Sequence, residues 1–310
     1  MNPETAFSGH TSMDAPITAI RFLRLPGRDI FSRRAGRLRH LSGNNQLLGT
    51  SYLAFLAQLC ESQQHALDRF PAVRLPDHLE QRLCREHGMP LLAAGSHHRD
   101  PAWRQALIGI LQRMKGHHLP QATREAMAGL AAAEEALLEE MADRILAGDL
   151  ETVPPGSLPF VAAALQVYWV HMAAAMEEEA FSRLAEKGLC PVCGSHPSVG
   201  VVHASGPEQG LRYLSCSLCA VQWHLVRITC SRCDSTAGID YYAIEGTDGA
   251  VKAESCADCG TYLKLLYLEK DGRMEATADD LATLSLDMLM DDEGKLRRGP
   301  NLLFHPGGAC

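Results

Sequence analysis

Eight of the eleven cysteines in this chain of 310 residues form four Cys-x-x-Cys pairs. Each cysteine of the first two pairs is repeated 40 residues later by a cysteine of the last two. Two such pairs can offer four thiolates to one ion, because each short loop brings two sulfurs to the same side. We therefore expect two metal sites, one in each repeat. Their ligands would be Cys190, Cys193, Cys216 and Cys219 in the first site, and Cys230, Cys233, Cys256 and Cys259 in the second.

The residue after each second cysteine should adopt a left-handed or otherwise permissive backbone conformation. The loop turns there so that its N–H groups can face the sulfurs, and glycine or a short polar residue tolerates that turn best. Gly194, Asp234 and Gly260 suit this requirement, whereas Ala220 departs from it. Within each repeat, 22 residues separate the two pairs. This spacing is typical of a zinc ribbon or a rubredoxin-like site.

Disulfide bonds are the alternative use of eight paired cysteines. We expect metal ions instead, because the chain shows no secretory signal and thiols at this spacing in a reducing compartment usually bind metal. Sulfur tetrahedra suit both zinc and iron, so the spacing leaves the metal open. A closed four-sulfur site keeps no position for water, which argues against hydrolytic chemistry. Its role is either structural or, with iron, the exchange of one electron.

Other polar residues that could do chemistry have simpler interpretations. Trp223 should shield the first site from water, and a ligand role for His224 is unnecessary beside four cysteines. The pairs His97/His98 and His117/His118 should be exposed, since adjacent residues on a helix diverge by about 100°. Asp279 and Asp280 fit a helix N-terminus better than an acid–base pair. The sequence therefore predicts no catalytic residues, no organic cofactor and no enzyme.

The composition excludes several classes of protein. The formal net charge is −8, and the thiolates would make the cysteine-rich part more negative still, which argues against a nucleic-acid-binding ribbon. The most apolar stretch, residues 160–176, is too short to span a membrane and contains Gln166 and His171. We expect a cytoplasmic protein without a membrane partner, and the oligomeric state stays open, with a homo-oligomer among the options.

The elements around these sites suggest an α+β protein that begins with an all-helical domain, residues 1–187. Residues 1–20 lack helical periodicity and should be a flexible extension. Apolar residues at helical spacing, with proline and glycine at the boundaries, predict five or six helices. Five of these can be placed, at residues 28–41, 47–70, 100–115, 121–147 and 159–186, the last capped by Gly188.

The second part, residues 188–270, is expected to be a duplicated rubredoxin-like or zinc-ribbon domain with repeats at 188–228 and 229–270. Its periodicity falls toward two, which predicts short strands at 211–215, 221–228, 239–244 and 261–269. Each repeat has too little apolar core to fold alone, so metal binding should supply much of its stability. The third part, residues 271–310, should contain a helix capped by Thr277 that packs back on the larger structure and ends at Gly294.

Residues 21–40 carry seven arginines against one acid, Asp29. The simpler interpretation is the solvated face of the first helix. The alternative is a contact for an acidic partner.

Several of these motifs together resemble the family of formate dehydrogenase accessory proteins called FdhE. The resemblance extends from about residue 25 to 304, and its specific part is the cysteine-rich half. It is carried by residues 190–195 (CPVCGS), 211–219 (LRYLSCSLC), 223–224 (WH), Arg227, the two later cysteine pairs, 262–264 (YLK), 278–284 (ADDLATL) and 286–287 (LD), and more loosely by 30–38.

This resemblance implies a cytoplasmic assembly factor that contacts the immature catalytic subunit of respiratory formate dehydrogenase. It also implies rubredoxin-like sites that can hold iron. A rubredoxin-like protein that moves single electrons during maturation of that enzyme is the alternative function.

Overall fold

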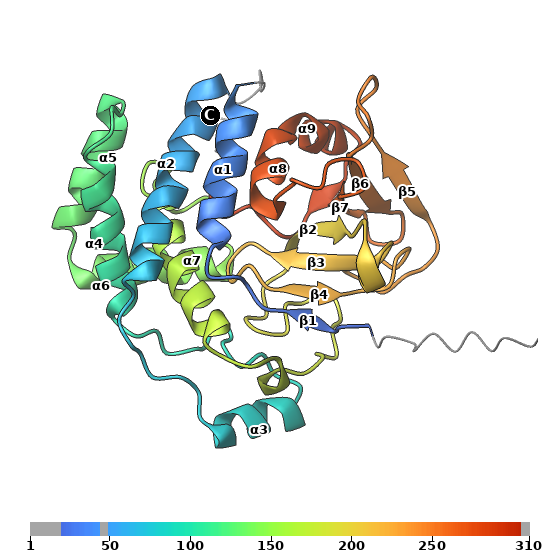
Figure 1. Ribbon diagram of the computed structural model, residues 1–310, viewed down its shortest axis with the longest axis horizontal. Coiled ribbons are helices and arrows are strands. Elements are labelled where there is room, and N and C mark those ends of the chain that lie inside the picture. Colours follow the sequence, from blue (N-terminus) through green and yellow to red (C-terminus); the bar gives the residue numbers. More distant parts are fainter. Residues whose placement is uncertain (1–19, 44–48, 305–310) are drawn as a thin grey trace, which may run out of the picture.

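The computed structural model describes residues 20–43 and 49–304, so all but the last residue of the extension predicted at 1–20, residues 44–48 with the start of the helix predicted at 47–70, and the terminal residues 305–310 lie outside it. Helices occupy one side of the described structure and a sheet the other (Figure 1). The helical side consists of α1 (Ile30–Ser42), α2 (Gly49–Asp68), α3 (His78–Glu86), α4 (Ala102–Met114), α5 (Gln121–Ala132), α6 (Glu135–Ala147) and α7 (Leu158–Ala174).

Helix α7 is the central element of the helical side. Every residue of α7 except His171 and Ala174 is buried, which explains why this stretch is the most apolar in the sequence. It packs against α2, α4 and α6. Among the described residues, no helix has both the length and the apolarity needed to cross a bilayer.

One predicted helix is divided in two, and another ends earlier than predicted. The helix predicted at 121–147 is divided by Ala133 and Glu134, which have extended backbone conformations, so that α5 contacts α4 and α6 contacts α7. The helix predicted at 159–186 ends at Ala174, and a short 3-10 turn, Glu178–Ala180, follows. Gly188 is not a helix cap: a Cβ there would lie 1.6 Å from the carbonyl oxygen of Ser231, because the second repeat passes directly over it.

The two cysteine repeats form one continuous sheet. Its strands follow the order β1-β4-β3-β2-β7-β6-β5, with β8 beside β7. Each repeat contributes three antiparallel strands, and the parallel pairing of β2 with β7 joins the repeats. The strands are β1 (Leu23–Arg24), β2 (Pro197–Val202), β3 (Arg212–Cys216), β4 (Gln222–His224), β5 (Ile239–Tyr242), β6 (Val251–Cys256), β7 (Thr261–Tyr267) and β8 (Leu296–Arg297).

The apolar periodicity of the sequence correctly predicted β3, β4, β5 and β7. It did not predict β2, β6 or the helix α3. The sequence of β2, PSVGVV, contains Pro197, Gly200 and two adjacent valines, so it lacks the regular alternation on which the prediction relied. β1 was also missed, because two residues carry no pattern of their own. It forms the edge of the sheet only by pairing with β4.

The tail folds back on the rest of the molecule through α8 (Ala276–Ala282) and α9 (Leu284–Asp292), and α8 contacts both α1 and β2. This confirms the predicted α+β architecture of a helical part, a two-cluster sheet and a returning tail. The N-cap of α8 is Glu275 rather than the predicted Thr277, and its side chain accepts hydrogen bonds from the N–H groups of Thr277 and Ala278.

The solvated-face interpretation of the arginine-rich segment is wrong for Arg34 and Arg37. Both are buried, and they pair with acids of this chain's own tail: Arg34 Nε lies 3.2 Å from Glu275 Oε1, and Arg37 Nε lies 2.9 Å from Asp279 Oδ2. The acidic partner therefore lies within the chain. Asp279 lies in the first turn of α8, as predicted, and accepts a hydrogen bond from the N–H of Glu275 at 2.7 Å, but it is buried and also pairs with Arg37 of α1.

Asp280 is also buried rather than a surface capping residue. It pairs with Lys264 Nζ at 2.7 Å and with Arg297 Nη2 at 2.7 Å. Burial disfavours its charge, but the positive charges of Arg297 and Lys264 outweigh that effect and lower the pKa of Asp280 to about 2. The tail is thus held to β7 by buried ion pairs.

Candidate metal centres

The structure brings the eight predicted cysteines into two clusters, each made from a single repeat. In each cluster the four sulfurs lie within 4.8 Å of one another. In the first, Sγ of Cys190 and Cys219 are 3.5 Å apart and those of Cys193 and Cys216 are 3.4 Å apart. The corresponding distances in the second cluster are 3.6 Å for Cys230/Cys259 and 3.7 Å for Cys233/Cys256.

The distances between the sulfurs can be compared with those expected for a four-sulfur metal site and for a disulfide bond. Four sulfurs about 2.3 Å from one zinc ion would be about 3.8 Å apart at the corners of a tetrahedron. A disulfide bond would bring two sulfurs to about 2.05 Å. The observed separations are close to the tetrahedral edge, and all eight cysteines are free thiols. The residues therefore fit one tetrahedral ion in each cluster.

All four cysteine loops have the predicted left-handed turn. The φ angles are 76° at Gly194, 56° at Ala220, 59° at Asp234 and 67° at Gly260. In each loop the N–H of this residue donates to the carbonyl of the loop's first cysteine, at 2.8 to 3.2 Å. Ala220 thus adopts the same conformation as the glycines despite its Cβ, so the loop geometry outweighs the local preference of that residue.

The protonation of the first cluster shows why it suits a cation. Desolvation by burial raises the pKa of Cys190 and Cys219 well above that of an ordinary thiol. Cys193 is equally desolvated, but hydrogen bonds from the neighbouring thiols outweigh this and lower its pKa. A buried thiolate needs a compensating positive charge, which a bound divalent ion would provide.

The two clusters differ in their exposure. All four cysteines of the first cluster are buried. In the second, Cys230 and Cys256 are buried, Cys259 is half-buried and Cys233 is exposed. This difference was not evident from the sequence, where the two repeats have the same cysteine spacing.

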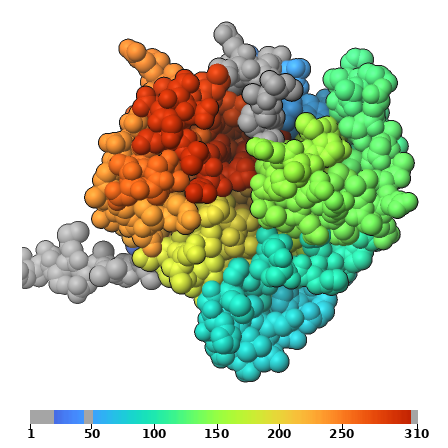
Figure 2. Space-filling view, turned by 180° about the vertical axis from the view of Figure 1, so that it is seen from behind, coloured from blue at the N-terminus to red at the C-terminus, as the bar shows by residue number. Residues whose placement is uncertain are grey.

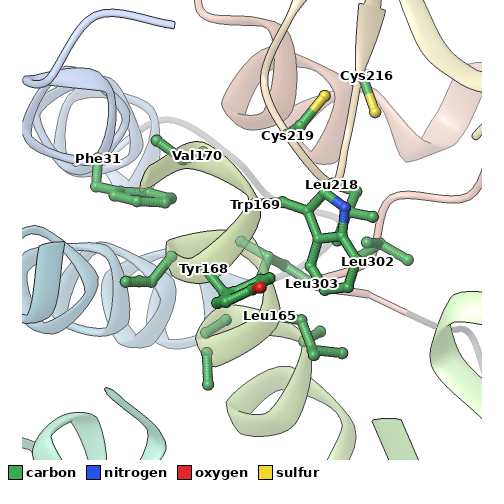
Figure 3. Packing of buried hydrophobic residues seen from close by; sticks show 14 of the residues in the cluster. Phe31, Leu165, Tyr168, Trp169, Val170, Cys216, Leu218, Cys219, Leu302 and Leu303 are labelled. Carbon is green, nitrogen blue, oxygen red and sulfur yellow. The ribbon is translucent and has the colours of Figure 1, made fainter. Parts of the chain in front are cut away.

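The helical part covers the first cluster. The N–H groups of Leu92 and Ala94 donate to the carbonyls of Val192 and Cys193, both at 2.8 Å, and the indole of Trp169 donates to the carbonyl of Leu92. Figure 3 shows Trp169 lying beside Leu218 of the second cysteine loop. In Figure 2 the segment around residues 80–100 (cyan) abuts the first repeat (yellow), whereas the second repeat (orange) lies away from it.

The residues that cover the first cluster were not predicted from the sequence, although one of them, Gln166, stands out there. Gln166 interrupts the most apolar stretch of the chain, and its Nε2 donates to the carbonyl of Ser217 at 2.7 Å. Its Oε1 accepts a hydrogen bond from Gln63 of α2. A buried polar residue in an apolar helix usually has such a partner, which here is the cysteine loop of another element.

The remaining predicted residues lie outside the clusters. Trp223 is buried, and its indole donates to the carbonyl of Lys187. His97 is half-buried rather than exposed, because its Nε2 lies 3.1 Å from the hydroxyl of Tyr168. Among the described residues, the two cysteine clusters are the groups whose side chains converge as metal ligands would.

These features define a class of protein in which a helical part packs on two four-cysteine ribbons joined in one sheet. Three family models match the chain in succession: "FdhE, N-terminal" at residues 20–186, "FdhE, central domain" at 189–227 and "FdhE, C-terminal domain" at 228–304. The chain belongs to the FdhE family.

Individual relatives agree with this assignment. A "Protein FdhE homolog" of Pseudomonas aeruginosa is 42% identical over 293 residues, which cover 92% of this chain and 93% of the relative. One of Serratia proteamaculans is 43% identical over 285 residues, covering 90% and 89%. The crystal structure of the FdhE protein from Pseudomonas aeruginosa superposes with a TM-score of 0.83 at 40% identity, covering 93% of this chain and all of that one.

Proposed function

We propose that this chain is an accessory protein for respiratory formate dehydrogenase. In this proposal it binds the immature catalytic subunit in the cytoplasm and is not itself an enzyme. The observation that carries the proposal is membership of the FdhE family over nearly the whole described chain. Closed four-sulfur clusters support it, because they leave no open position at which a substrate could react.

The proposal includes one metal ion, iron or zinc, in each cluster. Cys190, Cys193, Cys216 and Cys219 would hold the first, and Cys230, Cys233, Cys256 and Cys259 the second. A bound ion cross-links two loops of a repeat, and iron would in addition allow exchange of one electron. We also propose residues 1–187, 188–270 and 271–310 as the helical, metal-binding and tail domains.

Affinity capture tests the proposed partner. The tagged full chain is expected to retain the catalytic subunit of formate dehydrogenase before that subunit has received its cofactors. An unrelated molybdoenzyme provides the control. Equal recovery of the two enzymes would contradict the proposal.

A second function, one-electron transfer during maturation, is favoured by the exposure of Cys233, because an exposed ligand gives a redox partner access to the site. Protein purified without air should then contain iron and change its visible absorption on reduction. Zinc alone in such protein would exclude this second function and leave the first intact.

A further inference from the structure

We propose that the two clusters have different roles: the first retains its ion permanently, whereas the second exchanges its ion with solution through displacement of Cys233. This inference rests on the proposed binding of one ion by each cluster. The two clusters have the same cysteine spacing but differ in three respects, and these differences support the inference.

The first difference is the cover over matched cysteines. Cys193 and Cys233 are 40 residues apart and occupy the same position in their repeats. The loop of Cys193 is hydrogen-bonded to the segment that contains Leu92 and Ala94, and Cys193 is 1% exposed. The loop of Cys233 is exposed at Arg232, Cys233 and Asp234.

The second difference is a pocket at the second cluster. Cys233 lines a pocket of about 200 Å³ together with Lys187, Gly188 and His196. This volume admits a small molecule with a thiolate or chelating nitrogen donor, and Cys233, an exposed cysteine, is one of the residues that line it. Incoming donors can therefore approach the ion without any opening of the fold.

The third difference is the hydroxyl beside each cysteine. The Ser195 hydroxyl lies 3.4 Å from Cys193 Sγ. The equivalent Ser235 directs its hydroxyl to the carboxylate of Asp258. Leu218 stands at the position of Asp258 in the first repeat and cannot compete in this way. Such neighbours hold a metal ligand in place, and losing one typically weakens metal affinity by about 10- to 100-fold.

The exchange step follows from these differences. With an ion bound, the Cys233 sulfur would leave it with the electron pair and take a proton from water, while the incoming donor would take over the position that Cys233 had occupied. Cys230, Cys256 and Cys259 hold the ion until further donors replace them. No electron is transferred in this step.

Zinc release from the full chain tests the inference. Protein loaded with two zinc ions is mixed with the coloured chelator 4-(2-pyridylazo)resorcinol, and released zinc is followed by absorbance. One ion should leave at least about tenfold faster than the other, in keeping with the loss of a ligand-supporting contact. Cys233→Ser should abolish the fast phase and leave one slowly released ion.

Matched variants identify the cause. Asp258→Ala removes the carboxylate acceptor of the Ser235 hydroxyl, which then chooses between the Ala237 carbonyl at 3.2 Å and Cys233. We expect it to turn to Cys233 and to slow the fast phase about fivefold, the effect of one ordinary hydrogen bond. Asp258→Ala combined with Ser235→Ala should restore the fast rate. Since Asp258 is exposed and Ser235 is half-buried, these changes leave the buried core untouched.

The outcomes separate the inference from the proposal beneath it. Equal release rates for two bound ions, or a fast phase that survives Cys233→Ser, would overturn the inference while leaving metal binding intact. A protein that binds no zinc or iron would instead contradict the proposed metal sites.

Discussion

Single residues in the cysteine loops follow the demands of the turn rather than their own preferences. Ala220 and Gly260 are 40 residues apart, and both have positive φ angles in the same loop of the two repeats. A Cβ at Gly260 would meet nothing within 4 Å, so space does not require glycine there. The cost of a Cβ at either position therefore comes from the left-handed backbone conformation rather than from lack of space.

We expect Gly260→Ala to lower the free energy of unfolding by about 1 kcal/mol, because L-residues pay for a left-handed conformation. Ala220→Gly should raise it by up to about 1 kcal/mol, since the relief of that conformation exceeds the added freedom of the unfolded chain. Urea denaturation of metal-loaded protein measures both. A change of the same sign in the two variants would contradict this explanation.

At the scale of elements, the buried contact between α1 and α8 depends on charge. Arg37 donates to Asp279 and, at 2.8 Å, to Asp271, while the neighbouring Arg34 pairs with Glu275. These partners are more than 230 residues apart in the sequence. Helical periodicity indicated both helices, but it could not show that the arginines of one face the acids of the other.

Replacement of Arg37 by methionine should destabilise the protein by about 3 kcal/mol, because it leaves Asp279 buried without a counter-charge. Adding Asp279→Leu should recover part of that loss. Arg33→Met is the matched control: Arg33 and its partner Asp29 are both largely exposed, so it should cost less than about 1 kcal/mol. Urea denaturation of these three variants and of Asp279→Leu alone decides it, and additive effects of Arg37→Met and Asp279→Leu would disprove the coupling.

At the scale of the whole molecule, the helical part and the first repeat share one core. The same apolar cluster contains Trp169 of α7 and Leu218 of the cysteine loop. Gln63, Gln166 and the Ser217 carbonyl form a buried chain of hydrogen bonds from α2 through α7 to that loop. Stability of the first cluster should therefore depend on residues far from the cysteines.

Gln166→Met tests this dependence, because it keeps the shape of the side chain but leaves the Ser217 carbonyl and the Gln63 amide without this partner. The expected cost is about 2 kcal/mol in unfolding free energy. Gln112→Met, at an exposed position of α4, should have no comparable effect. Equal denaturation midpoints for the two variants would show that the helical part does not support the cluster.

The grouping of the eight cysteines into two clusters, the left-handed loops, most helices and the strands of alternating polarity were predictable, because each depends on residues close together in the chain. The break at Ala133 escaped prediction because packing outweighed a continuous helical pattern, and β2 escaped it because its sequence, PSVGVV, does not alternate regularly. Whether a cluster is buried or open depends on which distant segment covers it. Only the fold placed Leu92, Ala94 and Gln166 over the first cluster and left Cys233 of the second in contact with solvent.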